Sequence, residues 1–309
     1  MQKIQEIINQ VRKSVIGKDD VIEKTLMAML AGGHILLEDV PGVGKTSMAI
    51  AFSQAMDLSY KRMQFTPDVM PSDVTGYTMY DRNSGKNVYI PGAAMCNLFL
   101  ADEINRTSSK TQSALLEVME EGSITVDGIT RQVPRPYLVI ATQNPIGSAG
   151  TQPLPESQMD RFMVRLSMGY PDKQSEMEML RRRQPGSHGG RIQTVVTPQE
   201  LREMQQEVES IFVSDPLYEY ITDLASWTRM QPAIRLGLSP RGTLALFQMA
   251  KACAFFHGRD FLTPQDVQEV FPHVCIHRIW LDARAKVNGT GRQQIIRQAL
   301  LQVAAPVLV

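Results

Sequence analysis

The sequence predicts an α/β fold in which a parallel five-stranded sheet is sandwiched by helices, followed by a small all-helical domain. Short apolar runs alternate with helical segments up to about residue 170, which is typical of a parallel sheet with crossover helices. Beyond that point the patterns are helical. The length of 309 residues suggests about two domains at ~150 residues each, which we place at 1–172 and 173–309.

The N-terminal segment is an expected amphipathic helix, because Ile4, Ile7, Ile8 and Val11 fall on one stripe at helical spacing. No apolar signal-peptide core precedes this stripe. The longest apolar stretch, 26–37, is shorter than the ~20 residues of a membrane span. We therefore expect a cytoplasmic protein without a membrane span.

The expected strands are the apolar runs at 34–38, 60–65, 97–101, 137–142 and 162–166. The segment from Thr107 to Glu121 is an expected crossover helix, because Thr107 or Ser108 can cap its start and Gly122 can end it. Its expected buried stripe consists of Ala114, Leu115, Val118 and Met119.

Two hairpins are expected between these elements. Residues 123–133 centre on Asp127-Gly128, a dipeptide that favours the tight turn matching strand twist. Residues 80–90 turn around 83–86, with a shorter alternation on either side.

The chain changes character after Tyr170. Residues 176–183 are an expected helix, and 184–191 (QPGSHGGR) are an expected mobile linker. From Thr197 onward we expect helices only. Thr197 and Thr263 each stand at an N-cap position, with proline next and an acidic residue in the first turn.

The composition restricts the classes of function. The chain has 32 Lys+Arg and 32 Asp+Glu, so its net charge is zero, and its 43% apolar content excludes disorder. Binding to nucleic-acid phosphates usually needs a basic excess, so the balance favours a protein or small-molecule partner. The three cysteines form no CxxC pair, which favours reduced thiols over zinc ligands or disulfides.

The strongest motif is PGVGKT at 41–46, between the strand at 34–38 and a helix. Backbone N–H groups of such a loop surround a phosphate at a helix N-terminus. Lys45 can reach the β- and γ-phosphates and Thr46 can ligate Mg²⁺, although Asp39 stands where the general pattern has glycine. The expected nucleotide-binding residues of the loop are Pro41, Gly42, Val43, Gly44, Lys45, Thr46 and Ser47.

Polar residues also end two other strands. Asp102 can hold Mg²⁺ opposite Thr46, and Glu103 can accept a proton from the attacking water or orient it. Asn144 can hydrogen-bond the γ-phosphate or that water without adding charge.

Two arginines can complete the site. A guanidinium from a neighbouring subunit can stabilise the transition-state charge on the γ-phosphate, worth ~10³–10⁵ in rate. Arg161 and Arg241 are the candidates. From spacing alone, either is more often a member of a surface ion pair.

In combination these segments resemble the AAA+ ATPases, and among them the MoxR family. The similarity runs from Val15 to the end of the helical domain, and the order of the segments is more specific than any one of them. The segments are VIGKDD (15–20), LLEDVPGVGKT (36–46), RMQFTPDVMPSDVTGY (62–77), LADEINRTSSKTQSALLEVMEEG (100–122), IATQNP (140–145), LPESQMDRF (154–162), LSPRGT (238–243), GRDFLTPQDV (258–267) and HRI (277–279).

The resemblance implies family roles for the candidate residues. It places Walker A at Lys45 and Thr46, Walker B at Asp102 and Glu103, sensor 1 at Asn144, the arginine finger at Arg161, sensor 2 at Arg241 and the adenine pocket at Val15, Ile16 and Gly17. Arg161 would reach a neighbouring subunit's nucleotide. Arg241 would contact the nucleotide from the lid, so that loss of the γ-phosphate shifts the lid relative to the sheet.

The resemblance also implies ATP and Mg²⁺ as cofactors and a hexameric ring as the assembly. An insert at about 67–92 would face the pore, and the hairpin at 123–133 would precede sensor 1. The implied activity is that of a chaperone-like motor that remodels or assembles partner proteins, including proteins with a von Willebrand factor A domain. The sequence departs from the family pattern at 91–99 and at Leu238 and Gly242, where alanines are common.

Three alternatives use similar motifs. A GTPase would fit the D-x-x-G pattern at 73–76, but the chain has no N-K-x-D or T-K-x-D stretch to bind guanine. A helicase or clamp loader is disfavoured by the zero net charge and by Asp127 at the hairpin tip. A non-hydrolysing nucleotide switch could lose Glu103, Asn144 and Arg161, all of which are present.

Overall fold

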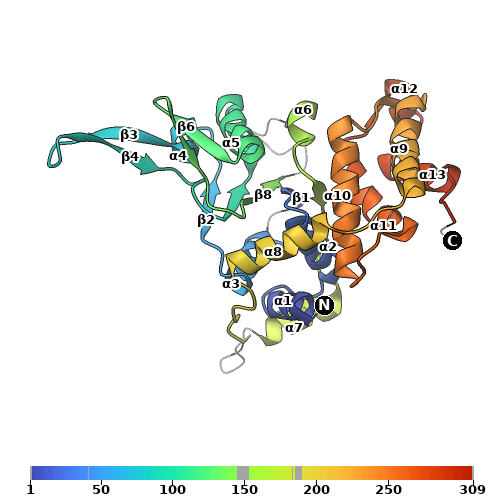
Figure 1. Ribbon diagram of the computed structural model, residues 1–309, viewed down its shortest axis with the longest axis horizontal. Coiled ribbons are helices and arrows are strands. Elements are labelled where there is room, and N and C mark those ends of the chain that lie inside the picture. The colour runs from blue at the N-terminus through green and yellow to red at the C-terminus, as the bar shows by residue number, and fades with distance from the viewer. Residues whose placement is uncertain (1, 41, 145–152, 183, 185–189, 308–309) are drawn as a thin grey trace.

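The computed structural model describes residues 2–40, 42–144, 153–182, 184 and 190–307. At its centre is a five-stranded sheet whose strands pair in the order β2-β5-β8-β1-β9, with every pair parallel (Figure 1). The strands are β1 (Ile35–Glu38), β2 (Tyr60–Gln64), β5 (Leu98–Asp102), β8 (Leu138–Gln143) and β9 (Val164–Leu166). The predicted strands and the predicted fold class are confirmed.

The neighbouring strands β5 and β8 are buried along their whole length because helices cover both faces of the sheet. Side chains alternate between faces along a strand. Ile35 and Leu37 therefore belong to a core shared with α1 (Gln2–Arg12), α2 (Asp19–Leu30) and α3 (Lys45–Ala55), whereas Leu36 belongs to a second core with α5 (Ser109–Glu121). The predicted N-terminal stripe is buried in the first core.

Helix α5 forms where the sequence predicts it. Ser108 is its N-cap and accepts a hydrogen bond from Thr111 N at 3.3 Å, and Gly122 ends it in the left-handed conformation with φ 61°. Leu115, Val118 and Met119 are buried as expected. Ala114 is only half-buried, because the buried stripe also runs through Leu116.

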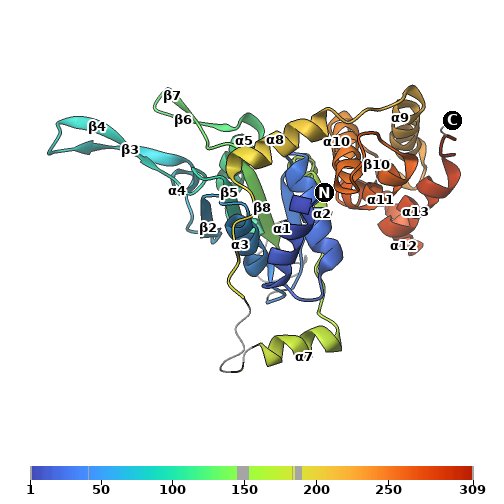
Figure 2. The same ribbon diagram turned by 60° about the horizontal axis from the view of Figure 1, so that its bottom comes forward.

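Both predicted hairpins are present, and they project from the side of the sheet opposite the C-terminal helices (Figures 1 and 2). Strands β6 (Ser123–Val126) and β7 (Ile129–Gln132) are joined by Asp127 and Gly128, with φ of 53° and 75°. Strands β3 (Gly76–Asp81) and β4 (Lys86–Pro91) form a longer hairpin than expected. It begins four residues earlier than predicted, directly after α4 (Pro71–Thr75) in the chain. The Arg131 guanidinium lies 4.0 Å from the centroid of the Tyr89 ring and links the two hairpins.

The C-terminal part is mainly helical. Its helices are α7 (Lys173–Arg181), α8 (Pro198–Glu209), α9 (Asp215–Met230), α10 (Pro240–Phe256), α11 (Pro264–Cys275), α12 (Ala283–Val287) and α13 (Arg292–Gln302). Thr197 and Thr263 form capping boxes as predicted. The prediction of helices only is wrong for β10 (Ile234–Leu236) and β11 (Trp280–Leu281), which pair antiparallel and are too short to show an alternating pattern.

The C-terminal helices share their core with the α/β part. One continuous cluster of buried side chains contains residues of α1–α3 and of α8–α11. Val195 N donates to Ala55 O at 2.8 Å, and Gln205 Nε2 donates to Met29 O at 2.8 Å, so the chain after α7 returns along the first core. A boundary at residue 172 stays a prediction, and most of the predicted linker lies outside the described residues.

Among the described residues, no helix combines the length and the apolar character needed to span a membrane.

Candidate nucleotide-binding site

A cavity of about 360 Å³ lies at the carboxyl ends of β1, β2, β5 and β8. Parallel strands bring these ends to one edge of the sheet, where α/β proteins usually bind ligands. Its lining residues are Gly42, Gly44, Lys45, Thr46, Ser47, Arg62, Gln64, Asp102, Glu103 and Asn144. All of these except Arg62 and Gln64 are candidates from the sequence.

The loop before α3 has the geometry of a phosphate site. Gly42 and Gly44 have φ of 86° and 99°, a region that L side chains rarely adopt. Apart from the chain neighbours of Gly42, no heavy atom of the described residues lies within 4 Å of the position that a Cβ at Gly42 would take, so this side of the loop is open. Helix α3 begins at Lys45, which directs its unpaired N-terminal N–H groups toward the same cavity. These features fit a bound phosphate chain; Pro41 lies outside the described residues.

Lys45 is buried at the base of the loop, with 8% of its surface exposed. Its Nζ donates to Asp39 O at 2.9 Å and to Val40 O at 3.3 Å. Burial lowers the pKa of Lys45, and the carboxylates of Asp39, Asp102 and Glu103 oppose that shift. The ammonium is therefore held in place by backbone carbonyls, with two carboxylates across the cavity.

Asp39, the departure from the general loop pattern, has a structural role. Its buried carboxylate accepts from Ser167 Oγ at 2.9 Å and from Gly169 N at 3.0 Å, and also from Met168 N. These donors lie in the loop after β9. An aspartate at this position thus ties the base of the phosphate loop to the neighbouring strand's loop, which a glycine could not do.

Both carboxylate oxygens of Asp102 have partners. Oδ1 accepts from Thr142 Oγ1 at 2.6 Å, and Oδ2 accepts from Arg62 Nη2 at 2.7 Å. Arg62 was not predicted, because it stands in an ordinary strand pattern on β2. The register, which pairs Gln64 with Asp102, brings it beside Asp102. Each carboxylate oxygen keeps a further lone pair, so Asp102 could still hold a divalent cation together with Thr46.

Glu103 occupies a strained position between polar partners. Its φ of 56° is in the left-handed region, which is uncommon for a residue other than glycine and concentrates at functional sites. Oε1 accepts from Asn144 Nδ2 at 3.0 Å, and Oε2 accepts from Arg106 Nη1 at 2.8 Å. Burial raises the pKa of Glu103, but these hydrogen bonds outweigh it and lower the pKa, so the side chain is a carboxylate at neutral pH.

The residues of the predicted adenine segment are not among those that line this cavity. Val15 is buried and Ile16 is half-buried. Gly17 has a φ of 68°, and a Cβ there would lie 1.9 Å from Ser175 Oγ in α7, so no side chain fits. The next residue, Lys18, donates from Nζ to Tyr170 O at 2.8 Å. The segment therefore packs on α7 and the loop after β9.

The two candidate arginines lie at the opposite edge of the sheet. Arg161 precedes β9, and its Nε donates to Glu120 Oε2 at 2.9 Å. Arg241, in the first turn of α10, donates from Nη2 to Glu120 Oε1. The structure thus brings both arginines to Glu120 at the end of α5. It does not bring Arg241 to the cavity of its own chain, which is the position that the family resemblance implies.

Comparisons with known proteins agree with this geometry. Residues 34–164 match the model of the ATPase family associated with various cellular activities (AAA), and residues 227–299 match the AAA lid domain. Chaperone MoxR1 of Mycobacterium tuberculosis is 36% identical over 98% of this chain and 82% of its own.

The chain belongs to the MoxR family of AAA+ ATPases.

Other relatives and one solved structure extend this assignment. Protein MoxR of Methylorubrum extorquens is 30% identical over 93% of this chain and 89% of its own, and YeaC of Bacillus subtilis is 44% identical over 97% and 94%. A crystal structure from Cytophaga hutchinsonii, assigned as an ATPase, superposes with a TM-score of 0.92 at 38% identity, covering 99% of this chain and 96% of that one. This MoxR protein therefore shares its fold with that solved structure.

Proposed function

We propose that this MoxR protein is a Mg²⁺-dependent ATPase that acts in a hexameric ring as a chaperone-like motor on partner proteins. The observation that carries the proposal is the convergence of Lys45, Asp102 and Glu103 on one cavity next to the helix N-terminus of α3. A cation, a metal-binding carboxylate and a second carboxylate at a phosphate loop are the parts that nucleotide hydrolysis requires.

Each side chain of the cavity has its own role in this mechanism. Lys45 and the loop N–H groups bind the phosphates, and Thr46 and Asp102 would hold the metal, which neutralises developing phosphate charge when bound. The carboxylate of Glu103 orients the attacking water and accepts its proton. Asn144 fixes that carboxylate through its 3.0 Å hydrogen bond. Asn144 and Arg106 both hydrogen-bond the carboxylate of Glu103. A side chain held in this way favours a hydrolysing enzyme over a non-hydrolysing nucleotide switch.

We assign both Arg161 and Arg241 to a neighbouring subunit's nucleotide. Each lies at the amino edge of the sheet, whereas the cavity lies at the carboxyl edge. In a ring, one subunit's amino edge would face the next subunit's cavity. Two adjacent guanidinium groups would then stabilise charge on the transferred phosphoryl oxygens.

A protein partner suits the projecting hairpins. Met70, Tyr77, Met79, Tyr80 and Val88 are exposed on or beside β3 and β4. Exposed methionine and aromatic side chains adapt to protein surfaces, and aromatic residues are frequent in interfaces. Because one relative is named a chaperone, we propose that client proteins in the cytoplasm, among them proteins with a von Willebrand factor A domain, are remodelled here.

Steady-state phosphate release by Glu103→Gln tests the proposed chemistry. Losing the general base should lower hydrolysis by about 10²–10⁴-fold, while fluorescent ATP still binds, because the loop and Lys45 are intact. Hydrolysis at the wild-type rate by a variant that binds ATP would refute the mechanism. The same variant should retain partners in affinity capture when ATP is present, with Lys45→Ala, which lacks the phosphate contact, as the matched control.

A further inference from the structure

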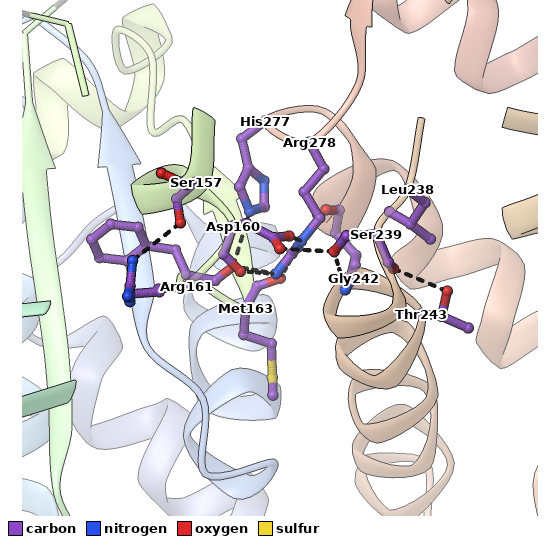
Figure 3. A network of polar contacts seen from close by, with 12 residues as sticks. Ser157, Asp160, Arg161, Met163, Leu238, Ser239, Gly242, Thr243, His277 and Arg278 are labelled. Carbon is purple, nitrogen blue, oxygen red and sulfur yellow. Dashed lines mark hydrogen bonds and ion pairs between the residues drawn. The ribbon is translucent and has the colours of Figure 1, made fainter. Parts of the chain in front are cut away.

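A polar network at the amino edge of the sheet joins three segments that are distant in the sequence (Figure 3). They are residues 160–163 before β9, Ser239 at the start of α10, and residues 277–278 after α11. At its centre is Arg278, with 4% of its surface exposed. A buried guanidinium is costly unless its donors are satisfied, so the contacts of Arg278 decide what it does.

All five N–H donors of Arg278 have acceptors. The acceptors are Asp160 Oδ1 (2.8 Å), Asp160 O (3.0 Å), Phe162 O (2.6 Å), Met163 O (2.9 Å) and Val274 O (2.6 Å). All but the last belong to the segment that carries Arg161. His277 Nε2 also forms a hydrogen bond with the Phe162 carbonyl oxygen, at 2.9 Å. Since a lysine has three donors on one nitrogen, this arrangement specifically requires arginine.

The carboxylate of Asp160 connects this segment to α10. Its Oδ1 is bound by Arg278, and its Oδ2 accepts from Ser239 Oγ at 2.7 Å. Ser239 is the N-cap of α10 and accepts from Gly242 N at 2.9 Å. Figure 3 shows Asp160 between Arg278 and Ser239. Arg241 lies within the turn that Ser239 caps.

One network around the buried Arg278 therefore fixes the backbone on both sides of Arg161 and the first turn of the helix that carries Arg241. We propose that Arg278, through Asp160, is a positioning residue that holds Arg161 and Arg241 as one rigid pair toward a neighbouring subunit's nucleotide. This inference rests on the proposed trans action of the two arginines. The pair already converges on the two oxygens of Glu120 within the single chain.

Loss of Arg278 should displace Arg161 and Arg241 and should leave the variant's own nucleotide cavity unchanged. A displacement of about 1 Å in a catalytic group can lower rates by about 10²-fold. For Arg278→Met we therefore expect kcat to fall by about 10- to 100-fold, with KM and the affinity for fluorescent ADP within twofold of wild type, because Lys45 and Thr46 are untouched.

Mixing variants separates positioning from folding. An Arg278→Met subunit has an intact cavity, and a Glu103→Gln subunit has intact arginines. Adding excess Glu103→Gln protein should restore hydrolysis at the Arg278→Met cavities to at least about half the wild-type rate per subunit, as it should for Arg161→Ala. Arg292→Met is the matched control for loss of a lid arginine, since Arg292 lies over Trp280 and donates to Ile276 O; its kcat should stay within twofold.

Each outcome has a defined meaning. If Arg161→Ala is rescued and Arg278→Met is not, or if Arg278→Met hydrolyses at the wild-type rate, the positioning role is wrong and the proposed function stands. If neither variant is rescued, trans action fails, and this inference fails with it. Should Arg278→Met not fold, Asp160→Asn carries the same test, because an amide keeps the shape but replaces one accepting oxygen by a donor.

Discussion

At the scale of single residues, His34 gives the structure a defined pH dependence. Its Nε2 contacts Met119 O at 3.0 Å, and its Nδ1 accepts from Val139 N at 3.1 Å, so both nitrogens are satisfied only in the neutral ring. Burial lowers the pKa of His34 from 6.5 to about 4, against the hydrogen bond to Met119. Stability from His34 is therefore present above pH 6.5 and is lost as pH falls toward 4.

Unfolding by urea at pH 7 and pH 5 measures this effect. At about 1.4 kcal/mol per pH unit below 6.5, the wild type should lose about 2 kcal/mol more than His34→Asn, in which the carboxamide oxygen can still accept from Val139 N. His277, also buried and with its pKa lowered, is common to both proteins and cancels in the comparison. Equal losses in the two proteins would contradict the assignment.

Residues with local signals were predictable, and residues defined by tertiary neighbours were not. Lys45 follows a glycine-containing loop at the start of α3 and Asp102 ends β5, both in recognisable patterns, and the structure brings them together. Arg62 and Glu120 have no such pattern, because Arg62 meets Asp102 through strand register and Glu120 meets two arginines through packing. Asp39 was seen only as a departure, since its hydrogen-bond donors lie more than a hundred residues away in the chain.

At the scale of elements, strands and capped helices follow from periodicity because each is encoded within a few consecutive residues. Strands β10 and β11 lack that signal, since three and two residues cannot show alternation. The hairpin of β3 and β4 is longer than predicted because Gly76, paired with Pro91, extends the ladder past the alternating residues.

At the start of α10, the side chain of Leu238 occupies space that a side chain at position 242 would need, and we call this arrangement a packing exchange. A Cβ at Gly242 would lie 2.8 Å from Leu238 Cδ1 and 2.8 Å from Arg278 Cδ. Leu238 and Arg278 therefore fill the space that an alanine at 242 would need. The family resemblance implies alanine at both positions, and this chain instead pairs a larger residue at 238 with a smaller one at 242.

Gly242→Ala should destabilise the fold by about 1–3 kcal/mol through overpacking, reduced by up to about 1 kcal/mol of helix propensity. Leu238→Ala should lose about 2–5 kcal/mol by leaving a cavity. The double variant should lose at least about 0.5 kcal/mol less than the sum, because the alanine enters the vacated space. Urea unfolding of the four proteins measures this coupling, and strict additivity would contradict the exchange.

At the scale of the whole molecule, the cavity and the arginine pair lie at opposite edges of one sheet. The lid helices share a continuous core with α1–α3, and the Arg278 network fixes α10 to the segment before β9. The family resemblance implies that Arg241 couples the lid to its own nucleotide. The structure instead places Arg241 where a movement of β9 or α10 would carry both arginines together.

This arrangement predicts how hydrolysis depends on assembly. Since no chain would complete its own site, specific activity should rise with protein concentration as rings form. Arg161→Ala and Arg241→Ala should each lower kcat by at least about 10²-fold, and the double variant should lose much less than the product, because the pair acts as a unit. Glu120 binds both arginines in the single chain, so neither substitution disturbs the cavity residues.

Nucleotide binding below the assembly concentration supplies the discriminating measurement. Dilute Arg241→Ala should bind fluorescent ATP as tightly as dilute wild type, because in one chain Arg241 contacts Glu120 at the edge of the sheet away from Lys45. A several-fold weaker affinity at that dilution would place Arg241 on its own nucleotide instead. Lys45→Ala, whose ammonium lines the cavity, is the positive control and should lose binding at every concentration.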